Sequence, residues 1–411
     1  MIRLNVLIII PNLGSGGAQR VFHQQRQYFS AHFNITGCVF NWDGAFEADH
    51  ASDIVSLSVP AGHTLFHKIY YFLLRVIRLR KLKKKNKIDI AISHLEGADY
   101  VNLLSRKSDK VICWLHGTKK FDNNIEGWLG WVRKKIFIPI LYRRSNRIIC
   151  VSDGIRTELL HEYNFDPRTI ETLVNGFDQT EILKKVEERN SFPVEEIADG
   201  AFTLITHCRL ARQKNIDSLI SIFLKIKRRI KTKLVILGDG ELRDSLLVHA
   251  ESIGLKSYAV WRNDALTNEY DIYFAGYQSN PYPALSEATV YMMTSLWEGF
   301  PLALGEAMIC NVPTLAADCF TGPREILAPK LKAPQPIQVP LATPFGILMP
   351  LADSVGNIEL WVDEVYRLLE DEPKRMRLAD LAKRHMSEFD QTTIYKKWLQ
   401  VIYAQTTDIN N

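Results

Sequence analysis

Two basic side chains in the second half of this 411-residue chain have the spacing of an anion site. Arg209 and Lys214 flank the predicted entrance to a helix that starts near Asn215, directly after a predicted strand. Two cations beside the N–H groups of a helix N-terminus form a binding site for a diphosphate. The alternative is that both are exposed basic residues in a loop.

Two acidic side chains lie at the predicted start of another helix. Glu298 and Glu306 are eight residues apart, and Gly299 and Pro301 break the chain before that helix. We expect Glu298 at its beginning and Glu306 one turn inside. Amides near Phe300 to Leu302, the stretch that contains Pro301, would be uncapped donors at the helix start. Carboxylates accept hydrogen bonds from sugar or ribose hydroxyls; two solvated acids are the alternative.

Two loops in the first half could also carry chemistry. Gly16 and Gly17 end a glycine-rich loop that follows the first predicted strand, where the backbone could approach an anion closely. The loop is neither a dinucleotide fingerprint, because Gln19 stands where the third glycine is required, nor a P-loop, because no Gly-Lys-Ser/Thr follows. A plain tight turn is the alternative. His116, followed by Gly117, comes at the end of another predicted strand, where its side chain could reach into the cleft. The alternative is that this histidine is structural.

Strand-length apolar runs alternate with helix-length periodic segments along the chain. The predicted strands span residues 4–10, 35–40, 88–92, 111–115, 147–151, 170–174, 201–206, 233–237, 272–275, 288–292, 314–316 and 346–349. This alternation predicts an α/β protein with parallel sheets covered on both faces. Ligands of such sheets bind beyond the carboxyl ends of the strands, which confines the search for a site to the loops that follow strands.

The pattern pauses once, in the polar and acidic segment 184–200. We therefore expect two Rossmann-like, doubly wound domains that face a central cleft. Residues 1–190 would form the first domain and residues 191–385 the second. The remaining residues, 386–411, would form a helix that packs back on the first domain.

The charge of the chain is unevenly distributed. The formal net charge is +5, and residues 1–190 carry an excess of positive charge, much of it between residues 75 and 87. An apolar, aromatic stretch precedes that run, so that the whole segment spans residues 65–87, and residues 133–144 mix cations with aliphatic side chains. Such segments are typical of a monotopic surface that meets anionic lipid. A solvated helix face is the alternative. Nucleic acid is disfavoured because the aromatics cluster with aliphatics.

Composition excludes several classes of protein. Hydrophobic residues make up 46% and charged residues 24%, so the chain is not disordered. The six cysteines form no C-x-x-C pair, which argues against a zinc or redox motif and for buried thiols in a reducing compartment. No apolar stretch reaches transmembrane length. We expect a cytoplasmic protein, peripheral on the inner face of the cytoplasmic membrane.

Taken together, the motifs resemble those of the retaining glycosyltransferases of family 4, also called group 1, which have the GT-B fold. The matching segments run in the expected order over nearly the whole chain: residues 16–20, 116–117, 151–152, 174–178, 209–215, 238–241, 295–308 and 318–327. Two positions depart from the usual pattern, since Cys208 and Asn311 stand where glycines are usual. Asn311 tolerates positive φ and can still end a helix.

The resemblance implies a role for each candidate residue. Arg209 and Lys214 would bind the donor diphosphate, Glu306 the ribose and Glu298 the transferred sugar, with the backbone of residues 300–302 orienting sugar and phosphate. Gly16 and Gly17 would border the phosphate. His116 would lie beside the sugar and the acceptor, and Tyr277 would contact the base. The catalytic group would comprise His116, Glu298, Arg209 and Lys214.

These roles lead to a specific expectation for the reaction. A hexose or N-acetylhexosamine would pass from a nucleotide diphosphate sugar, with UDP the favoured nucleotide, to a lipid-linked or glycan acceptor with retention of configuration. The cations would stabilise the leaving diphosphate without a metal or other cofactor. The alternatives are another GT-B enzyme, such as a sugar-nucleotide epimerase or phosphorylase, or a non-catalytic membrane-bound scaffold.

Overall fold

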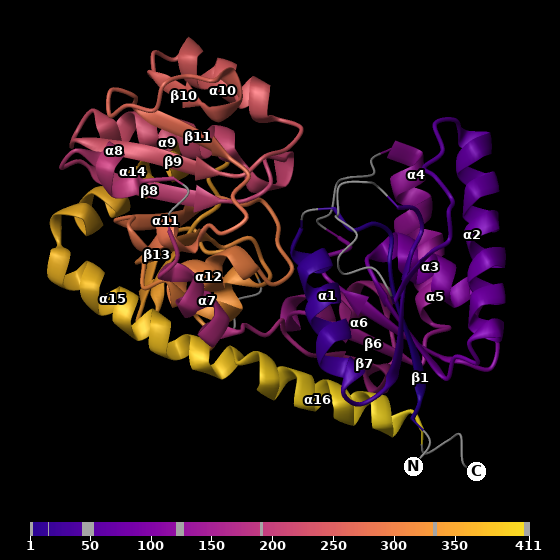
Figure 1. Cartoon of the computed structure of the whole chain (residues 1–411). Coiled ribbons are helices and arrows are strands. Elements are labelled where there is room, and N and C mark those ends of the chain that lie inside the picture. Colours follow the sequence, from indigo (N-terminus) through magenta and orange to yellow (C-terminus); the bar gives the residue numbers. More distant parts are fainter. Residues whose placement is uncertain are drawn as a thin grey trace. The chain divides into compact units, whose positions relative to one another are not determined.

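The structure is a computed structural model that describes residues 3–14, 16–42, 53–120, 127–189, 192–331 and 335–406. The chain divides into two compact units (Figure 1). The first comprises Met1–Asn175 with Thr392–Asn411, and the second comprises Gly176–Gln391. Among the helices of the described ranges, none is long and apolar enough to cross a membrane.

The first unit is built on a seven-stranded parallel sheet. Its strands, in spatial order, are β3 (Ile54–Ser56), β2 (Asn34–Val39), β1 (Asn5–Ile10), β4 (Ile90–His94), β5 (Lys110–Leu115), β6 (Arg147–Cys150) and β7 (Ile170–Thr172). The central strands are continuous runs of buried residues, as strands covered on both faces must be. The strand order reverses between β1 and β4, and this switch point is where doubly wound sheets place their ligands.

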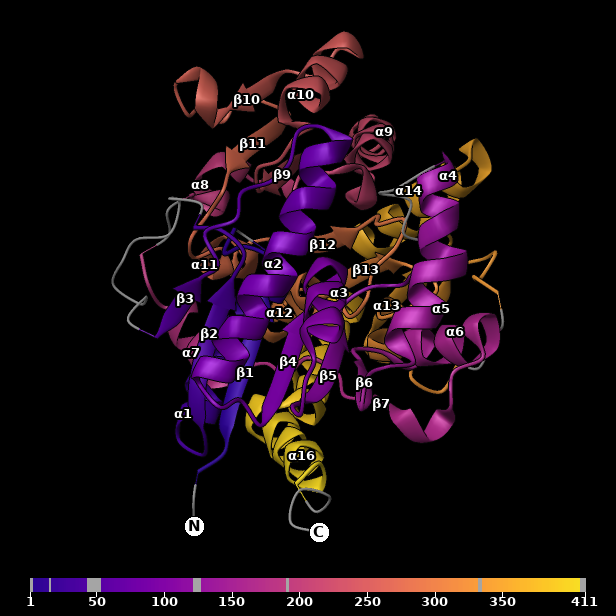
Figure 2. The ribbon, with the colours of Figure 1, turned by 90° about the vertical axis from the view of Figure 1, so that its right-hand side faces the viewer.

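Helices cover both faces of this sheet. Figures 1 and 2 show α1 (Gly17–Ser30) and α16 (Gln391–Ala404) on one face, with α2 (Leu65–Lys85), α3 (Glu96–Ser105) and α5 (Ile138–Tyr142) on the other. A single π-helical turn, Arg133–Phe137, joins α5 to α4 (Gly127–Val132), and α6 (Asp153–Tyr163) links β6 to β7. The C-terminal helix α16 is fixed to the first unit by its aromatic side chains, because Trp398 packs on Trp114 with ring centroids 4.4 Å apart.

The second unit is built on an eight-stranded sheet. Its strands, in spatial order, are β10 (Ser257–Ala259), β11 (Ile272–Gly276), β9 (Thr232–Leu237), β8 (Phe202–His207), β12 (Val290–Met293), β13 (Thr314–Ala317), β15 (Gly346–Met349) and β14 (Leu341–Thr343). All neighbours pair in parallel except β14 and β15. The order reverses between β8 and β12, which makes the loops after these two strands the expected ligand site.

The helices of the second unit also form two layers. Alternate strand residues pack against α9 (Ile216–Lys227), α10 (Arg243–Ser252) and α14 (Val355–Glu370) in one apolar core. The remaining helices are α7 (Gln179–Val186), α8 (Val194–Ala198), α11 (Tyr282–Ser286), α12 (Leu302–Ile309), α13 (Pro323–Leu327) and α15 (Glu372–His385). Of these, α12 contacts α7, α11 and α15, so both faces are covered.

The structure confirms every strand predicted from the sequence, together with their parallel arrangement. The sequence analysis missed β3, β10 and β14. Each has only three residues and all three lie at the outer edges of their sheets, so no apolar run marks them. The six cysteines are free, as expected, and all but Cys208 are buried.

Candidate functional site

The loops after β8 and β12 are linked into one structure at the switch point of the second unit. The hydroxyl of Thr294 donates a hydrogen bond toward the backbone carbonyls of Lys214 and Asn215, each 3.1 Å away. The backbone N–H of Leu296 donates to the carbonyl of Gln213 at 2.8 Å. These bonds hold the segment with the predicted cations beside the segment with the predicted carboxylate.

The structure brings Lys214 and Glu298 into a buried ion pair. Lys214 Nζ lies 2.6 Å from Glu298 Oε1, and their side chains are 20% and 8% exposed. Burial disfavours the charged amine, but the attraction of Glu298 outweighs this effect and raises the pKa of Lys214. Gln213 adds a donor, because its Nε2 bonds the carbonyl of Trp297 at 2.6 Å and lies 3.4 Å from Glu298 Oε2.

The second predicted cation lies in a different environment. Arg209 is 68% exposed and forms an ion pair with Glu241, 3.0 Å from its carboxylate oxygen. The Arg209 loop packs on the loop after β9, where Gly238 adopts φ 145° and a Cβ would fall 1.8 Å from the Cys208 carbonyl oxygen. Only glycine fits at that point. Arg209 is therefore an accessible guanidinium on a tightly packed backbone.

The start of α12 supplies the N–H donors that the sequence predicted. Pro301 is the N-cap residue, and no side chain caps the helix, so its first amides have no intrahelical acceptor. Gly322, at φ 75°, fits against this turn, since a Cβ there would lie 2.7 Å from the Gly299 carbonyl oxygen. Phe300 is 4% exposed and packs near Phe389. Its side chain anchors the turn, so only the backbone of Phe300 is available to contact a ligand.

Glu306 lies one turn inside α12, as predicted, and is 1% exposed. His207, the last residue of β8, faces it, with His207 Nε2 2.9 Å from Glu306 Oε2. The sequence analysis did not single out His207, and no local motif marks it. The helix ends at Ile309, and Asn311, which follows the C-cap residue Cys310, adopts φ 62°, so the expected positive-φ ending without glycine is confirmed.

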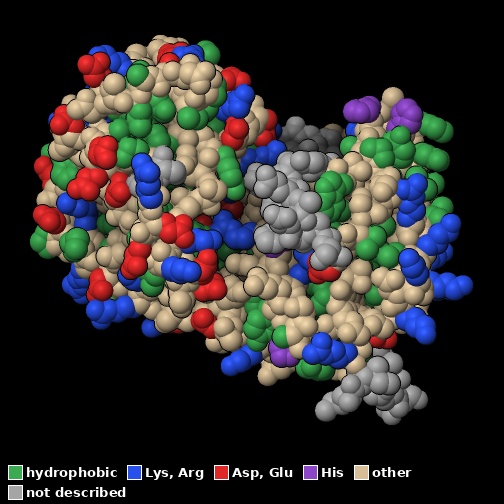
Figure 3. All heavy atoms as spheres, viewed as in Figure 1, with side chains coloured by type: hydrophobic (Ala, Val, Ile, Leu, Met, Phe, Trp, Pro, Cys, Tyr) green, Lys and Arg blue, Asp and Glu red, His purple; other side chains and the backbone are tan. Residues whose placement is uncertain are grey.

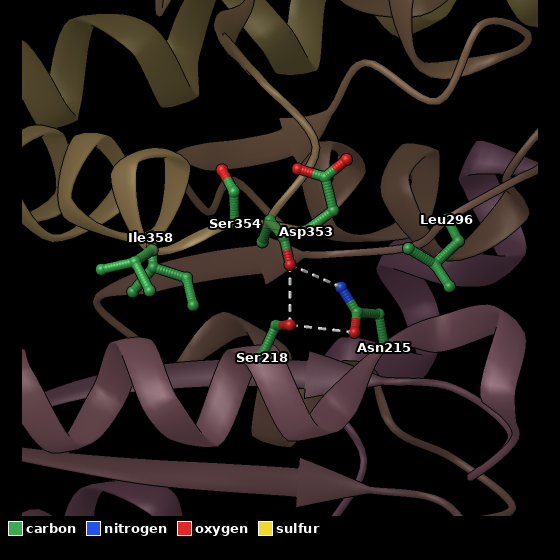
Figure 4. A pocket seen from close by; sticks show the side chains of 8 residues that line it. Asn215, Ser218, Leu296, Asp353, Ser354 and Ile358 are labelled. Atoms are coloured by element: carbon green, nitrogen blue, oxygen red, sulfur yellow. Dashed lines mark hydrogen bonds between the residues drawn. The ribbon is translucent and has the colours of Figure 1, made fainter.

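A pocket of about 450 Å³ lies beside these loops in the second unit. Asn215, Ser218 and Leu296 line one part of it and the start of α14 lines another (Figure 4). Ser218 Oγ donates to the Ala352 carbonyl at 2.7 Å and Asn215 Nδ2 donates to the same oxygen at 3.1 Å. The Asn215 and Ser218 side chains in this pocket are therefore engaged in hydrogen bonds to one another and to the backbone.

Two other predicted contacts lie on separate loops. Tyr277 follows β11 and is 65% exposed, which leaves its ring accessible for stacking. Gly16 is the N-cap residue of α1 and Gly17 its first residue, and both are exposed. Ser15, within the same glycine-rich loop, lies outside the described residues.

His116 lies after β5 at the carboxyl edge of the first unit's sheet. Its Nε2 is 3.0 Å from Nδ1 of His94, the last residue of β4, and His94 Nε2 is 2.9 Å from Oε1 of Gln25 in α1. Burial lowers the pKa of His116 to about 3, so the ring is neutral at physiological pH. The sequence analysis identified His116 but neither of its two partners.

The expectation of a continuous basic surface needs correction at two residues. Lys83 is buried, with Nζ 2.7 Å from Asp109, and Arg133 is buried in a bidentate contact with Glu96. Both are internal ion pairs and neither reaches the surface. A lone buried cation is costly, so each is paired with an acid brought in from another element.

Two units with this topology define the GT-B class of α/β proteins. Residues 15–181 match the family described as Glycosyltransferase Family 4, and residues 187–333 match the family described as Glycosyl transferases group 1. The two matches together span most of the chain, which is a glycosyltransferase of the group 1 type. The resemblance of its motifs to those of group 1 glycosyltransferases is thereby confirmed.

Characterised and uncharacterised relatives span most of the chain. An uncharacterized glycosyltransferase of Methanocaldococcus jannaschii is 26% identical over 81% of this chain and 84% of its own length. An N-acetylgalactosamine-N,N'-diacetylbacillosaminyl-diphospho-undecaprenol 4-alpha-N-acetylgalactosaminyltransferase of Campylobacter jejuni is 25% identical over 96% of this chain and 98% of its own. Anabaena HepE, solved with UDP and glucose, shares the fold with a TM-score of 0.72 at 16% identity, covering 98% of this chain and 100% of HepE.

Proposed function

We propose that this glycosyltransferase moves a hexose or N-acetylhexosamine from a UDP-sugar to a lipid-linked sugar at the cytoplasmic face of the membrane. The observation that carries the proposal is the group formed by Lys214, Glu298 and the uncapped start of α12, with exposed Arg209 on the neighbouring loop. A diphosphate needs cations and N–H donors, and a sugar needs a carboxylate acceptor. One switch point supplies all of them.

The chemistry follows from where charge develops. As the bond between the anomeric carbon and the diphosphate breaks, negative charge grows on the leaving group, and positive groups held in place stabilise it. Lys214, Arg209 and the amides that start α12 would do this without a metal. We infer front-face attack, in which the leaving phosphate accepts the proton of the acceptor hydroxyl and configuration is retained. Gly16 and Gly17 would border the phosphate, Glu306 would hold the ribose, Tyr277 the base, and His116 would contact sugar and acceptor.

The acceptor is inferred from the surface of the first unit and from a relative. Among the exposed residues of α2, seven form a stripe at helical spacing that is apolar at its start and basic at its end: Phe66, Ile69, Tyr70, Leu73, Ile77, Lys81 and Lys84. Figure 3 shows hydrophobic side chains gathered over the start of α2 and basic ones further along it. Trp128 and Trp131 of α4 are also exposed. This pattern suits anionic lipid, and the Campylobacter relative is named for a polyprenyl diphosphate acceptor.

Product analysis tests this function directly. The purified protein is incubated with UDP-glucose, UDP-galactose, UDP-N-acetylglucosamine or UDP-N-acetylgalactosamine, with and without short-chain polyprenyl-diphosphate sugars. We expect an acceptor-dependent product in which NMR shows the α-linkage of the donor. A sugar released or epimerised equally well without acceptor would favour another GT-B enzyme, and the absence of turnover with every donor would favour a scaffold.

A further inference from the structure

Two adjacent strands of the first unit bring two histidines into direct contact. In the register of β4 and β5, His94 pairs with Trp114, so His116 follows two residues beyond that pair. The imidazole rings lie nearly parallel, at 15°, with centroids 5.1 Å apart. His94 is fully buried, and Gln25 of α1 is fully buried on its other side.

The hydrogen bonds that link Gln25, His94 and His116 indicate which ring nitrogens carry protons. Burial lowers the pKa of His94 well below its ordinary value, so the ring is neutral and carries one N–H and one lone pair. With the Gln25 amide placed so that Oε1 faces His94, that oxygen accepts, His94 Nε2 holds the proton and His94 Nδ1 accepts. His116 must then donate from Nε2, which leaves its lone pair on Nδ1.

The surroundings of the pair hold both rings in place. Phe22 of α1 meets His94 edge to face, and Trp114 contacts both imidazoles at 5.0 Å. Trp398 of α16 packs behind Trp114. The charged group acting on His116 is Lys119, whose ammonium further disfavours protonation of the ring. The pair therefore sits among aromatic groups, and Trp114 contacts both rings.

We propose that His94 is a positioning residue that fixes the tautomer and ring plane of His116, through the chain Gln25–His94–His116, so that His116 presents a hydrogen-bond acceptor at Nδ1. An acceptor at that atom would receive a hydroxyl hydrogen of the transferred sugar or of the acceptor. A partner that sets the tautomer of a working histidine contributes to catalysis without contacting the substrate. The proposal rests on the proposed function through the role given to His116.

Two substitutions of His94 separate positioning from simple packing. In His94→Asn the side-chain amide occupies the position of Nδ1 and can still accept from His116. In His94→Gln the amide occupies the position of Nε2, which keeps the contact with Gln25 and loses the one with His116. We expect His94→Gln to lower kcat by roughly tenfold to a hundredfold, with the KM for the sugar nucleotide unchanged, and His94→Asn to stay within about threefold of wild type.

Tautomer-sensitive nitrogen NMR of ¹⁵N-histidine-labelled protein gives a readout that does not depend on activity. The expected spectrum at neutral pH has His116 protonated on Nε2 in the wild type and in His94→Asn, and a mixture of tautomers in His94→Gln. Equal loss of kcat in both variants, an unchanged tautomer in His94→Gln, or a wild-type proton on Nδ1 of His116 would each overturn the proposal. If the tautomers behave as expected while the wild type transfers no sugar, the proposed function fails and the positioning role stands.

Discussion

Replacement of Arg209 by alanine separates catalysis from stability more cleanly than any other change in this site. The side chains of Arg209 and its partner Glu241 are 68% and 52% exposed. An exposed ion pair contributes only about 0.2–1 kcal/mol to folding. If Arg209 instead stabilises the departing diphosphate, its loss should raise the free energy of the transition state by roughly 2.7–4 kcal/mol, which is a 10²- to 10³-fold decrease in kcat.

The assay compares initial rates and melting temperatures of Arg209→Ala, Glu241→Gln and the wild type. Glu241→Gln is the matched control, because it removes the same ion pair and leaves the guanidinium in place. We expect Arg209→Ala to lose at least a hundredfold in kcat with little change in Tm, and Glu241→Gln to keep activity within about threefold. If Arg209→Ala remained within threefold of wild type, the reasoning that places the diphosphate at this loop would be refuted.

Four further predictions test other parts of the account. Lys214→Met should destabilise the protein by about 3–5 kcal/mol in chemical denaturation, because it leaves Glu298 buried and unpaired. The double variant Lys214→Met/Glu298→Gln should recover stability but not activity. Equal activity of the double variant and the wild type would contradict the role given to Lys214 and Glu298. Treatment with EDTA should leave the initial rate unchanged, whereas a loss that added metal reverses would show that a metal is required. Burial lowers the pKa of His116 to about 3, so below about pH 6.5 the unfolded chain takes up a proton that the folded chain excludes, and the stability of the fold falls. His116→Asn should therefore reduce the slope of unfolding free energy against pH, between pH 4 and 6.5, by up to about 1.4 kcal/mol per pH unit. An unchanged slope would contradict this. Glutamine substitution of the exposed lysines in the last turns of α2, Lys81, Lys84 and Lys85, should weaken binding to vesicles that contain phosphatidylglycerol and leave catalysis on a water-soluble acceptor unchanged. Identical binding would argue against a lipid-facing surface.

The sequence was sufficient to predict the central architecture because buried parallel strands are continuous apolar runs. The same logic pointed to the candidate site, since ligands of such sheets bind at the loops that follow strands. Lys214 and Glu298 were found in this way, from two segments more than eighty residues apart that the sheet brings together. The short strand β3 was missed because it is only partly buried and has three residues.

What the sequence could not predict are the pairings made between elements. Lys83 is one lysine in a run of cations, and only the position of Asp109, 26 residues away, makes it an internal residue. His207 meets Glu306 across 99 residues. His94 has no motif of its own and gains its partner through the register of two strands. Each contact depends on packing, which periodicity and composition do not encode.

The most direct test of the account is a crystal structure of the protein with UDP bound. The account predicts that the diphosphate oxygens lie within hydrogen-bond distance of Arg209, Lys214 and the first amides of α12, with both ribose hydroxyls at Glu306. A nucleotide bound elsewhere, with the Lys214–Glu298 pair and the start of α12 making no contact to it, would contradict the central claim.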